Sequence, residues 1–117
     1  MTLLEAIGER DRDALRELLA PDVVFHSPVQ TYRGREPAVL LLTTIGGILE
    51  DIELSREVDG ISFFQATIEE HPMDGVLVQK SDADGEVIEI TLMARPLAQL
   101  QAAVARMARA LTELELG

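Results

Sequence analysis

The sequence predicts one α+β domain over residues 1–117, because helical patterns and a run of consecutive strand patterns follow one another without a linker. Two helical segments open the chain, followed by a short strand, a third helix, three or four strands joined by turns, and a last helix. Consecutive strands joined by short turns pair antiparallel, so an antiparallel sheet packed against helices is expected. Apolar residues form 47% of the chain, which is enough for one buried core.

Four helices are predicted from the spacing of apolar residues and from end signals. They span residues 2–8, 11–19, 36–49 and 97–114, and Pro21 is expected to end the second. The third contains Gly46 and Gly47, and each glycine is about 1 kcal/mol less favourable than alanine inside a helix. This pair predicts either close packing against a neighbour or a bend. The last helix carries one apolar stripe that is expected to pack in the core: Leu97, Leu100, Val104, Met107, Leu111 and Leu114.

Strands are predicted at residues 23–26, 51–59, 61–70, 76–81 and 86–95. The turn Asp82-Ala83-Asp84-Gly85 joins the last two as a hairpin, because Asp and Gly tolerate left-handed backbone. Alternation along the final strand directs one set of side chains toward the core and the pocket: Ile88, Ile90, Leu92 and Ala94. The opposite, mixed set suits a partly covered outer face: Val87, Glu89, Thr91 and Met93.

Charge and composition argue against several classes of partner. The net charge is −11, and the ten Lys and Arg are scattered along the chain. No basic face is therefore expected, and neither nucleic acid nor an anionic membrane is a predicted partner. Cysteine is absent, which excludes disulfides and thiolate metal sites. The longest apolar run, Ala38–Leu42, is far shorter than a membrane span, and the first residues lack a signal-peptide pattern, so a cytoplasmic location is expected.

Two segments carry an architectural pattern. Leu19–Val29, closed by Tyr32-Arg33-Gly34, places a short apolar strand between an amphipathic helix and a turn, and Asp82–Pro96 places a turn before a strand. Together they resemble the SnoaL-like (polyketide cyclase-like) branch of the nuclear transport factor 2-like superfamily over nearly the whole chain. The resemblance implies a cone-shaped, cystatin-like fold, in which a curved antiparallel sheet wraps N-terminal and central helices around one pocket. It also implies a homodimer through the sheet.

The resemblance extends to ketosteroid isomerases, whose catalytic groups are one Asp base with a Tyr and a protonated Asp as hydrogen-bond donors. In those enzymes the base precedes a Pro-Val pair, and here Ser27 has that place before Pro28-Val29. The donor positions fall near Leu3 and Leu77, which are apolar. Ketosteroid-isomerase chemistry is therefore disfavoured.

Two other enzyme types on this fold remain open. A polyketide cyclase of this family needs a carboxylic acid on the sheet, and Glu53, Glu69 or Asp74 would supply it. An epoxide hydrolase of this family uses an Asp-Arg-Asp constellation. Arg56 and Arg95 are present, but no flanking Asp pair is evident at matching strand positions.

His26 is the single candidate for a catalytic acid or base, because it ends the first strand beside the expected pocket mouth and histidine titrates near neutrality. The favoured alternative is a half-buried histidine that is hydrogen-bonded to a loop carbonyl. His71 is expected in a solvated turn. Two histidines so far apart predict no metal site, and the absence of a phosphate loop or nucleophile elbow predicts no cofactor.

Three functions follow from these observations. The leading one is a domain that binds a small hydrophobic molecule, in a pocket with Ser27, Tyr32 and Gln79 as orienting polar groups. The full expected lining is Phe25, Ser27, Tyr32, Phe63, Phe64, Leu77, Gln79, Ile90 and Leu92. The second is an enzyme of the cyclase, isomerase or epoxide-hydrolase type that uses His26. The third is a non-catalytic homodimeric interaction module whose cone is plugged by Phe63, Phe64 and Met107.

Overall fold

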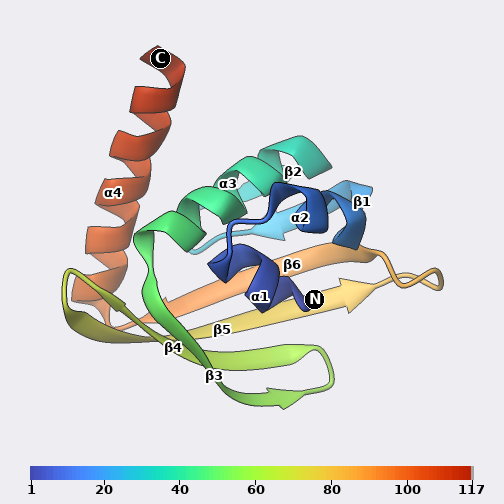
Figure 1. Ribbon diagram of the computed structural model, residues 1–117, viewed down its shortest axis with the longest axis horizontal. Helices are drawn as coiled ribbons and strands as arrows, with labels where there is room; N and C mark the ends of the chain where they lie inside the picture. Colours follow the sequence, from blue (N-terminus) through green and yellow to red (C-terminus); the bar gives the residue numbers. More distant parts are fainter. Residues whose placement is uncertain (117) are drawn as a thin grey trace.

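The computed structural model of the protein describes the backbone of residues 1–116 and the side chains of residues 1–113. It confirms the α+β class and the curved sheet (Figure 1). The elements follow the chain as α1 (Leu3–Gly8), α2 (Arg12–Leu18), β1 (Leu19–His26), β2 (Thr31–Arg33), α3 (Arg35–Ile48), β3 (Glu50–Val58), β4 (Ile61–Ile68), β5 (His71–Ser81), β6 (Val87–Arg95) and α4 (Leu97–Leu116).

The described strands form one sheet in the order β2-β1-β6-β5-β4-β3. All neighbouring strands pair antiparallel except β1 and β6, which run parallel. Figure 1 shows α1, α2 and α3 lying on one face of the bent sheet, while α4 rises at one end of it. The core lies between these helices and the sheet, and its largest fully buried side chains include Leu15, Phe25, Leu42, Leu77 and Ile90.

The beginning of β1 differs from the prediction. The second helix ends at Leu18, and the strand begins at Leu19 and passes through Pro21. Leu19 pairs with Val87 of β6, and regular pairing resumes at Val24, with an irregularity between the two positions. Proline lacks the N–H that a strand ladder uses, so it is tolerated in this irregular, exposed section of the strand.

The start of β6 also corrects the predicted alternation. Ile90, Leu92 and Ala94 face inward as expected, but Ile88 is 39% exposed and Val87 is buried. The pairing of β5 with β6 shifts between Lys80 and Ser81, as at a β-bulge. An extra residue at a bulge reverses the face of everything before it, and this reversal turns Val87 toward the core.

The two glycines of α3 allow close packing. A methyl group at Gly46 would overlap the carbonyl oxygen of Ile7, so α1 and α3 meet backbone to backbone here. At Gly47 a methyl group would lie 3.5 Å from Cδ and Nη1 of Arg10, which is ordinary contact with a flexible side chain. The predicted close packing therefore belongs to Gly46, and Gly47 faces an arginine.

Candidate functional site

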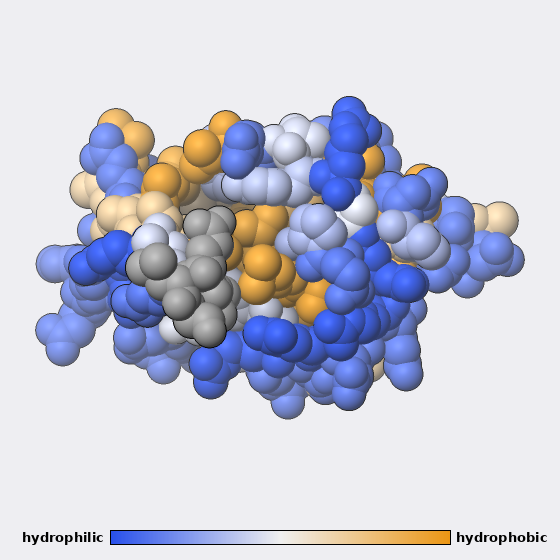
Figure 2. Space-filling model, turned by 90° about the horizontal axis from the view of Figure 1, so that it is seen from above, coloured by the Kyte–Doolittle hydropathy of each residue, from blue (hydrophilic) through white to orange (hydrophobic). Residues whose placement is uncertain are grey.

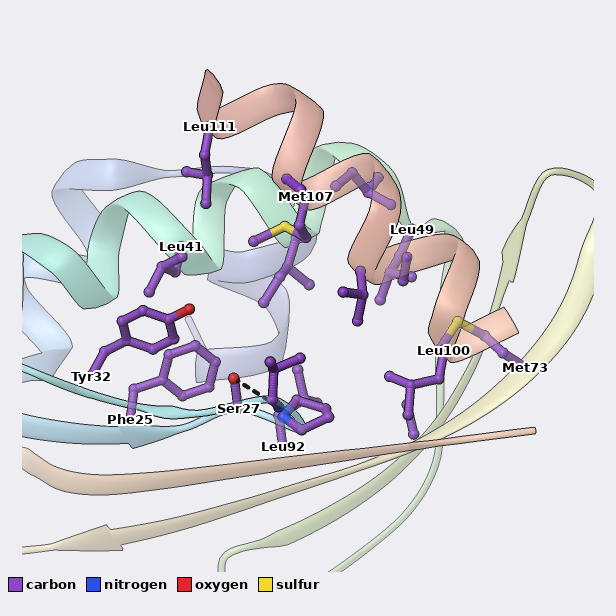
Figure 3. Close-up of a pocket in the computed structure, with 18 of the residues that line it drawn as sticks. Phe25, Ser27, Tyr32, Leu41, Leu49, Met73, Leu92, Leu100, Met107 and Leu111 are labelled. Carbon is purple, nitrogen blue, oxygen red and sulfur yellow. Dashed lines mark hydrogen bonds between the residues drawn. The ribbon is translucent and has the colours of Figure 1, made fainter. Parts of the chain in front are cut away.

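A cavity of about 270 Å³ lies between the concave face of the sheet, α3 and α4. On the sheet side, Phe25 and Tyr32 form one part of the wall, and Phe64, Leu92 and Ala94 form another. Leucine, isoleucine and methionine side chains of α3 and α4 cover them from above (Figure 3). From above, hydrophobic surface is visible in the middle of a largely hydrophilic face (Figure 2).

Helix α4 forms one wall of the cavity. Leu100, Met107 and Leu111 lie on one side of the helix because residues three or four positions apart share a face, and all three line the cavity. The stripe was expected to pack in the core, and this expectation is wrong in part: Leu97 is 66% exposed and Val104 is 36% exposed. Leu114 lies outside the residues whose side chains are described. The stripe therefore remains partly exposed and lines a hollow instead of filling it.

Phe25 and Tyr32 hold each other in place. They are direct partners across β1 and β2, and their rings stack with centroids 6.2 Å apart and an interplanar angle of 28°. Aromatic pairs at such positions stabilise a sheet beyond their burial alone. Tyr32 is thereby fixed on a rigid support, and its hydroxyl points into the cavity (Figure 3).

The hydrogen bonds of the two polar lining residues differ. Ser27 Oγ donates to the carbonyl oxygen of Gln30 at 2.8 Å and accepts from the backbone N–H groups of Val29 and Gln30. Its proton is therefore used within the turn between β1 and β2. Tyr32 accepts from the Gln30 side-chain amide at 2.7 Å, and its own O–H makes no hydrogen bond to a described group. The Tyr32 O–H is thus the side-chain donor left for a ligand.

The rest of the described wall is apolar. Apart from Tyr32, none of the lining side chains within residues 1–113 is titratable. Glu53 and Glu69 are exposed, and Asp74 pairs with Arg95, whose Nη1 lies 3.1 Å from Oδ2 of the carboxylate. None of these three carboxylates lines the cavity. The described wall therefore offers apolar burial and one hydroxyl donor.

The structure brings five of the nine residues predicted for the pocket to the cavity: Phe25, Ser27, Tyr32, Phe64 and Leu92. Phe63 is 41% exposed on the outer face of the sheet, because it alternates with the inward Phe64. Leu77 and Ile90 are buried in the core away from the cavity. Gln79 lies farther along β5, where its N–H donates to Gly60. Phe64 and Met107 line the cavity without filling it, and Phe63 points away from it.

His26 does not line the cavity, because it follows the inward Phe25 and so projects from the outer face. Its Nδ1 lies 2.9 Å from the Thr31 hydroxyl, and its Nε2 lies 3.0 Å from Glu89 Oε2. Lys80 Nζ lies 3.2 Å from the other oxygen of Glu89. Hydrogen bonding from His26, followed by that from Lys80, lowers the pKa of Glu89. The geometry thus contradicts a position of His26 at the pocket mouth and replaces the expected loop carbonyl with Thr31 and Glu89.

Several lining residues were not predicted. Met73 comes from β5, Leu41 and Ile45 from α3, and Leu100 from α4. Their apolar periodicity marks them as inward-facing but does not separate a core position from a cavity position. Within the described residues, no group of three or more His, Asp or Glu is placed to hold a metal ion. No described helix is long and apolar enough to span a membrane.

Comparison with known proteins supports the same architecture. No match was found among curated proteins. A steroid delta-isomerase from Pseudomonas aeruginosa is 29% identical in sequence, with a TM-score of 0.89 over 97% of this chain and 88% of that one. An uncharacterised bacterial protein with a cystatin-like fold from Silicibacter pomeroyi is 25% identical, with a TM-score of 0.88 over 97% and 85% of the two chains. A designed protein with a curved β-sheet, 15% identical and with a TM-score of 0.70 over 94% and 99%, shares the fold.

The family assignment rests on the sequence as well as on the fold. The model of the SnoaL-like domain matches residues 2–94, which run from the N-cap of α1 almost to the end of β6. The similarity to the Silicibacter pomeroyi protein, which has a cystatin-like fold, is consistent with this family match. The chain therefore belongs to the SnoaL-like domain family, within the nuclear transport factor 2-like superfamily.

Proposed function

We propose that the protein binds a small, uncharged, largely apolar molecule in the cavity, and that the Tyr32 O–H donates a hydrogen bond to a carbonyl or ether oxygen of this ligand. The observation that carries the proposal is the Tyr32 hydroxyl, a donor without a described acceptor in an otherwise apolar wall. Pockets for small molecules combine this kind of apolar lining with a few placed polar groups.

The apolar wall supplies the affinity in this proposal. Burial of apolar surface contributes roughly 25 cal/mol per Å² removed from water. A volume of about 270 Å³ suits a compact molecule of a few fused or substituted rings. A charged ligand is disfavoured, because burying an unpaired charge in such a wall costs far more than burying a neutral polar group.

The single donor supplies the orientation. The Gln30 amide donates to the Tyr32 oxygen, which leaves the phenolic proton directed at the ligand. The stacked Phe25 ring restricts the movement of the Tyr32 ring. A ligand with one acceptor oxygen at its edge would therefore bind in one preferred orientation.

An enzymatic function of the isomerase type is the second candidate, favoured by the similarity to the steroid delta-isomerase. Isomerisation by proton transfer requires a base within hydrogen-bond reach of the substrate. The described cavity wall contains no carboxylate or histidine, and His26 projects from the other face of the sheet. Ligand binding without proton transfer therefore fits the described residues better.

The first experiment is native mass spectrometry of protein purified without added ligand, followed by extraction of any bound molecule. The second is titration with 2-decalone and with decalin, which differ by one carbonyl oxygen. Tyr32→Phe is expected to weaken 2-decalone binding about tenfold, the usual effect of one hydrogen bond, and to leave decalin binding unchanged. Ala94→Leu, which narrows the cavity, should weaken both. Equal affinity of wild type and Tyr32→Phe for 2-decalone would contradict the proposed donor.

The outer face of the sheet supports a further part of the proposal, a homodimer. Phe63, Val76 and Met93 are partners across β4, β5 and β6, and Phe63 and Met93 are 41% and 51% exposed. Ile61 and Val78 form the adjoining pair. Contiguous exposed apolar residues of this kind mark protein interfaces, and a two-fold axis would bring the patch against its own copy.

Light scattering at micromolar concentration tests the dimer. The wild-type protein is expected to have twice the mass of the chain, and Phe63→Glu is expected to be monomeric, because it places a charge in the apolar patch, where association would take it out of water. Leu40→Glu is the matched control, since Leu40 is 37% exposed but lies on α3 at the other side of the sheet. A monomeric wild-type protein would refute the proposed dimer.

A further inference from the structure

A second hollow lies beside the cavity, with Ile48 in the lining of both, where α4 approaches α3 and the residues from the end of α1 to the start of α2. It has a volume of about 520 Å³, and four arginines line it: Arg10, Arg12, Arg106 and Arg109. We call this hollow the arginine groove. Thr43, Thr44 and Gly47 of α3 and Glu113 of α4 also contribute to its lining. The arginines come from positions 10–12 and 106–109, which are far apart in the sequence.

The charge of the groove contrasts with that of the protein. The net charge is −11 and the chain has ten Lys and Arg, so four of the ten gather at this hollow. Elsewhere Arg16, Lys80 and Arg95 pair with carboxylates at 3.1–3.2 Å. No described carboxylate lies within 4.0 Å of a side-chain nitrogen of the four groove arginines. The gathered guanidinium groups are therefore available to an external anion.

The backbone at Arg10 is unusual for an arginine. The N–H of Asp11 donates to the carbonyl of Ala6, and the N–H of Arg10 donates to that of Ile7, which is the Schellman arrangement that ends α1. Arg10 occupies the left-handed position of this motif with φ of 53°. Glycine usually has this position, because a Cβ is unfavourable there. The arginine side chain thus stands where the backbone alone would favour glycine.

The residue of α3 that faces Arg10 is also unusual for its position. Gly47 is an exposed residue inside α3, where glycine is less favourable than alanine. Arg10 lies against it, with Nη1 3.5 Å from the place that a Cβ of Gly47 would have. The guanidinium group therefore rests on the surface of α3, on the side of the groove. Arg10 and Gly47 therefore both depart from the residue that the local backbone favours. Neighbouring departures of this kind are expected at functional sites.

We propose that the arginine groove binds a multivalent oxyanion, with the phosphoryl group of a small soluble molecule as the favoured chemistry. Guanidinium groups match the oxygens of phosphate in paired, charge-assisted hydrogen bonds, and several of them on one anion are stronger than one. The lining within the described residues has no aromatic side chain on which a base could stack. The phosphoryl group itself is therefore the recognised part.

Glu113 is the acidic residue of the arginine groove, and its removal should change anion binding in the opposite direction to the removal of an arginine. It lines the same groove and stands four residues after Arg109 on α4, a spacing that allows the two side chains to pair. Its negative charge opposes an incoming anion. Glu113→Gln is therefore expected to strengthen anion binding, whereas loss of an arginine weakens it.

Calorimetric titration with inorganic pyrophosphate at constant ionic strength tests the site. The double variant Arg106→Gln/Arg109→Gln should bind pyrophosphate at least about tenfold more weakly than the wild type, because it loses hydrogen bonds from two charged groups, which are stronger than neutral ones. Arg56→Gln is the matched control for a change in charge, because Arg56 is exposed on β3 outside the groove. The affinity of this variant for pyrophosphate should stay within about twofold of that of the wild type. Arg10→Gly should also weaken binding while keeping or raising the melting temperature, so that unfolding does not explain the loss.

Three results would overturn the proposal. The first is no pyrophosphate binding by the wild-type protein up to about 10 mM, a weaker affinity than a built site provides. The second is an equal loss in Arg56→Gln, which would assign binding to overall charge. The third is equal or tighter binding of sulfate or citrate than of pyrophosphate, which would remove the preference for a phosphoryl group.

Discussion

The ring of Phe64 lies directly over Gly75, its partner across β4 and β5, so that a methyl group at Gly75 would overlap three atoms of the ring. An aromatic side chain over a strand glycine covers the exposed backbone and fixes the ring. The same ring lines the cavity. The absence of a side chain at Gly75 therefore decides where part of the cavity wall lies.

Gly75→Ala is expected to destabilise the protein by about 1–3 kcal/mol, because Phe64 must leave a packed position. Urea denaturation of the variant and the wild type measures this difference. Gly8→Ala is the control: its methyl group would meet only Ile52 Cδ1, at an ordinary 3.8 Å, and its stability should change by less than about 1 kcal/mol. Equal stability of Gly75→Ala and wild type would contradict the packing of Phe64 on Gly75.

The neighbouring glycines of α3 should respond in opposite ways. Gly46→Ala is expected to cost about 2 kcal/mol or more, because the new methyl group overlaps the backbone of Ile7 and the helices must separate. Gly47→Ala meets only the flexible Arg10 side chain and should stabilise by up to about 1 kcal/mol through helix propensity. Thermal unfolding of both variants measures the contrast, and a similar loss in both would argue against the close contact of α1 with α3.

The cluster of His26, Glu89 and Lys80 predicts a small dependence of stability on pH. The pKa of Glu89 is lowered in the folded protein, so the ionised carboxylate stabilises the fold above its ordinary pKa of 4.5. This contribution is lost as the pH falls through the lowered value. Glu89→Gln should therefore be slightly less stable than wild type at pH 7, and the difference should shrink in acid. The effect is expected to be small because the ion pairs are exposed. A difference that grows below pH 4 would contradict the sign.

His26 provides a test of the two faces of the sheet. His26→Ala is expected to leave the affinity for 2-decalone within about twofold of wild type, because the imidazole projects from the face opposite the cavity. Tyr32→Phe, on the adjacent strand and the inner face, should lower the same affinity. A loss in His26→Ala as large as that in Tyr32→Phe would place the histidine in the binding site and favour an enzymatic function.

The sequence by itself determined the fold class, the order of most elements and the family. Local signals suffice for the fold class and the order of the elements, since capping residues, apolar spacing and turn residues act over a few positions. The family came from the resemblance of two segments, residues 19–34 and 82–96, to the SnoaL-like branch. Alternation along the final strand also placed Leu92 and Ala94 on the inner face correctly. It failed at Ile88, because a bulge depends on the partner strand as well as on the strand itself.

Only the tertiary structure decided which inward residues enclose empty space and which fill the core. Ile90 and Leu92 share a strand and a face, yet Ile90 is fully buried and Leu92 lines the cavity, because α4 covers one end of the sheet without packing tightly against it. Tertiary structure also brought together Arg10, Arg12, Arg106 and Arg109, which appear scattered along the chain. Local patterns specify which way a side chain points, whereas the residues it meets depend on how distant segments pack.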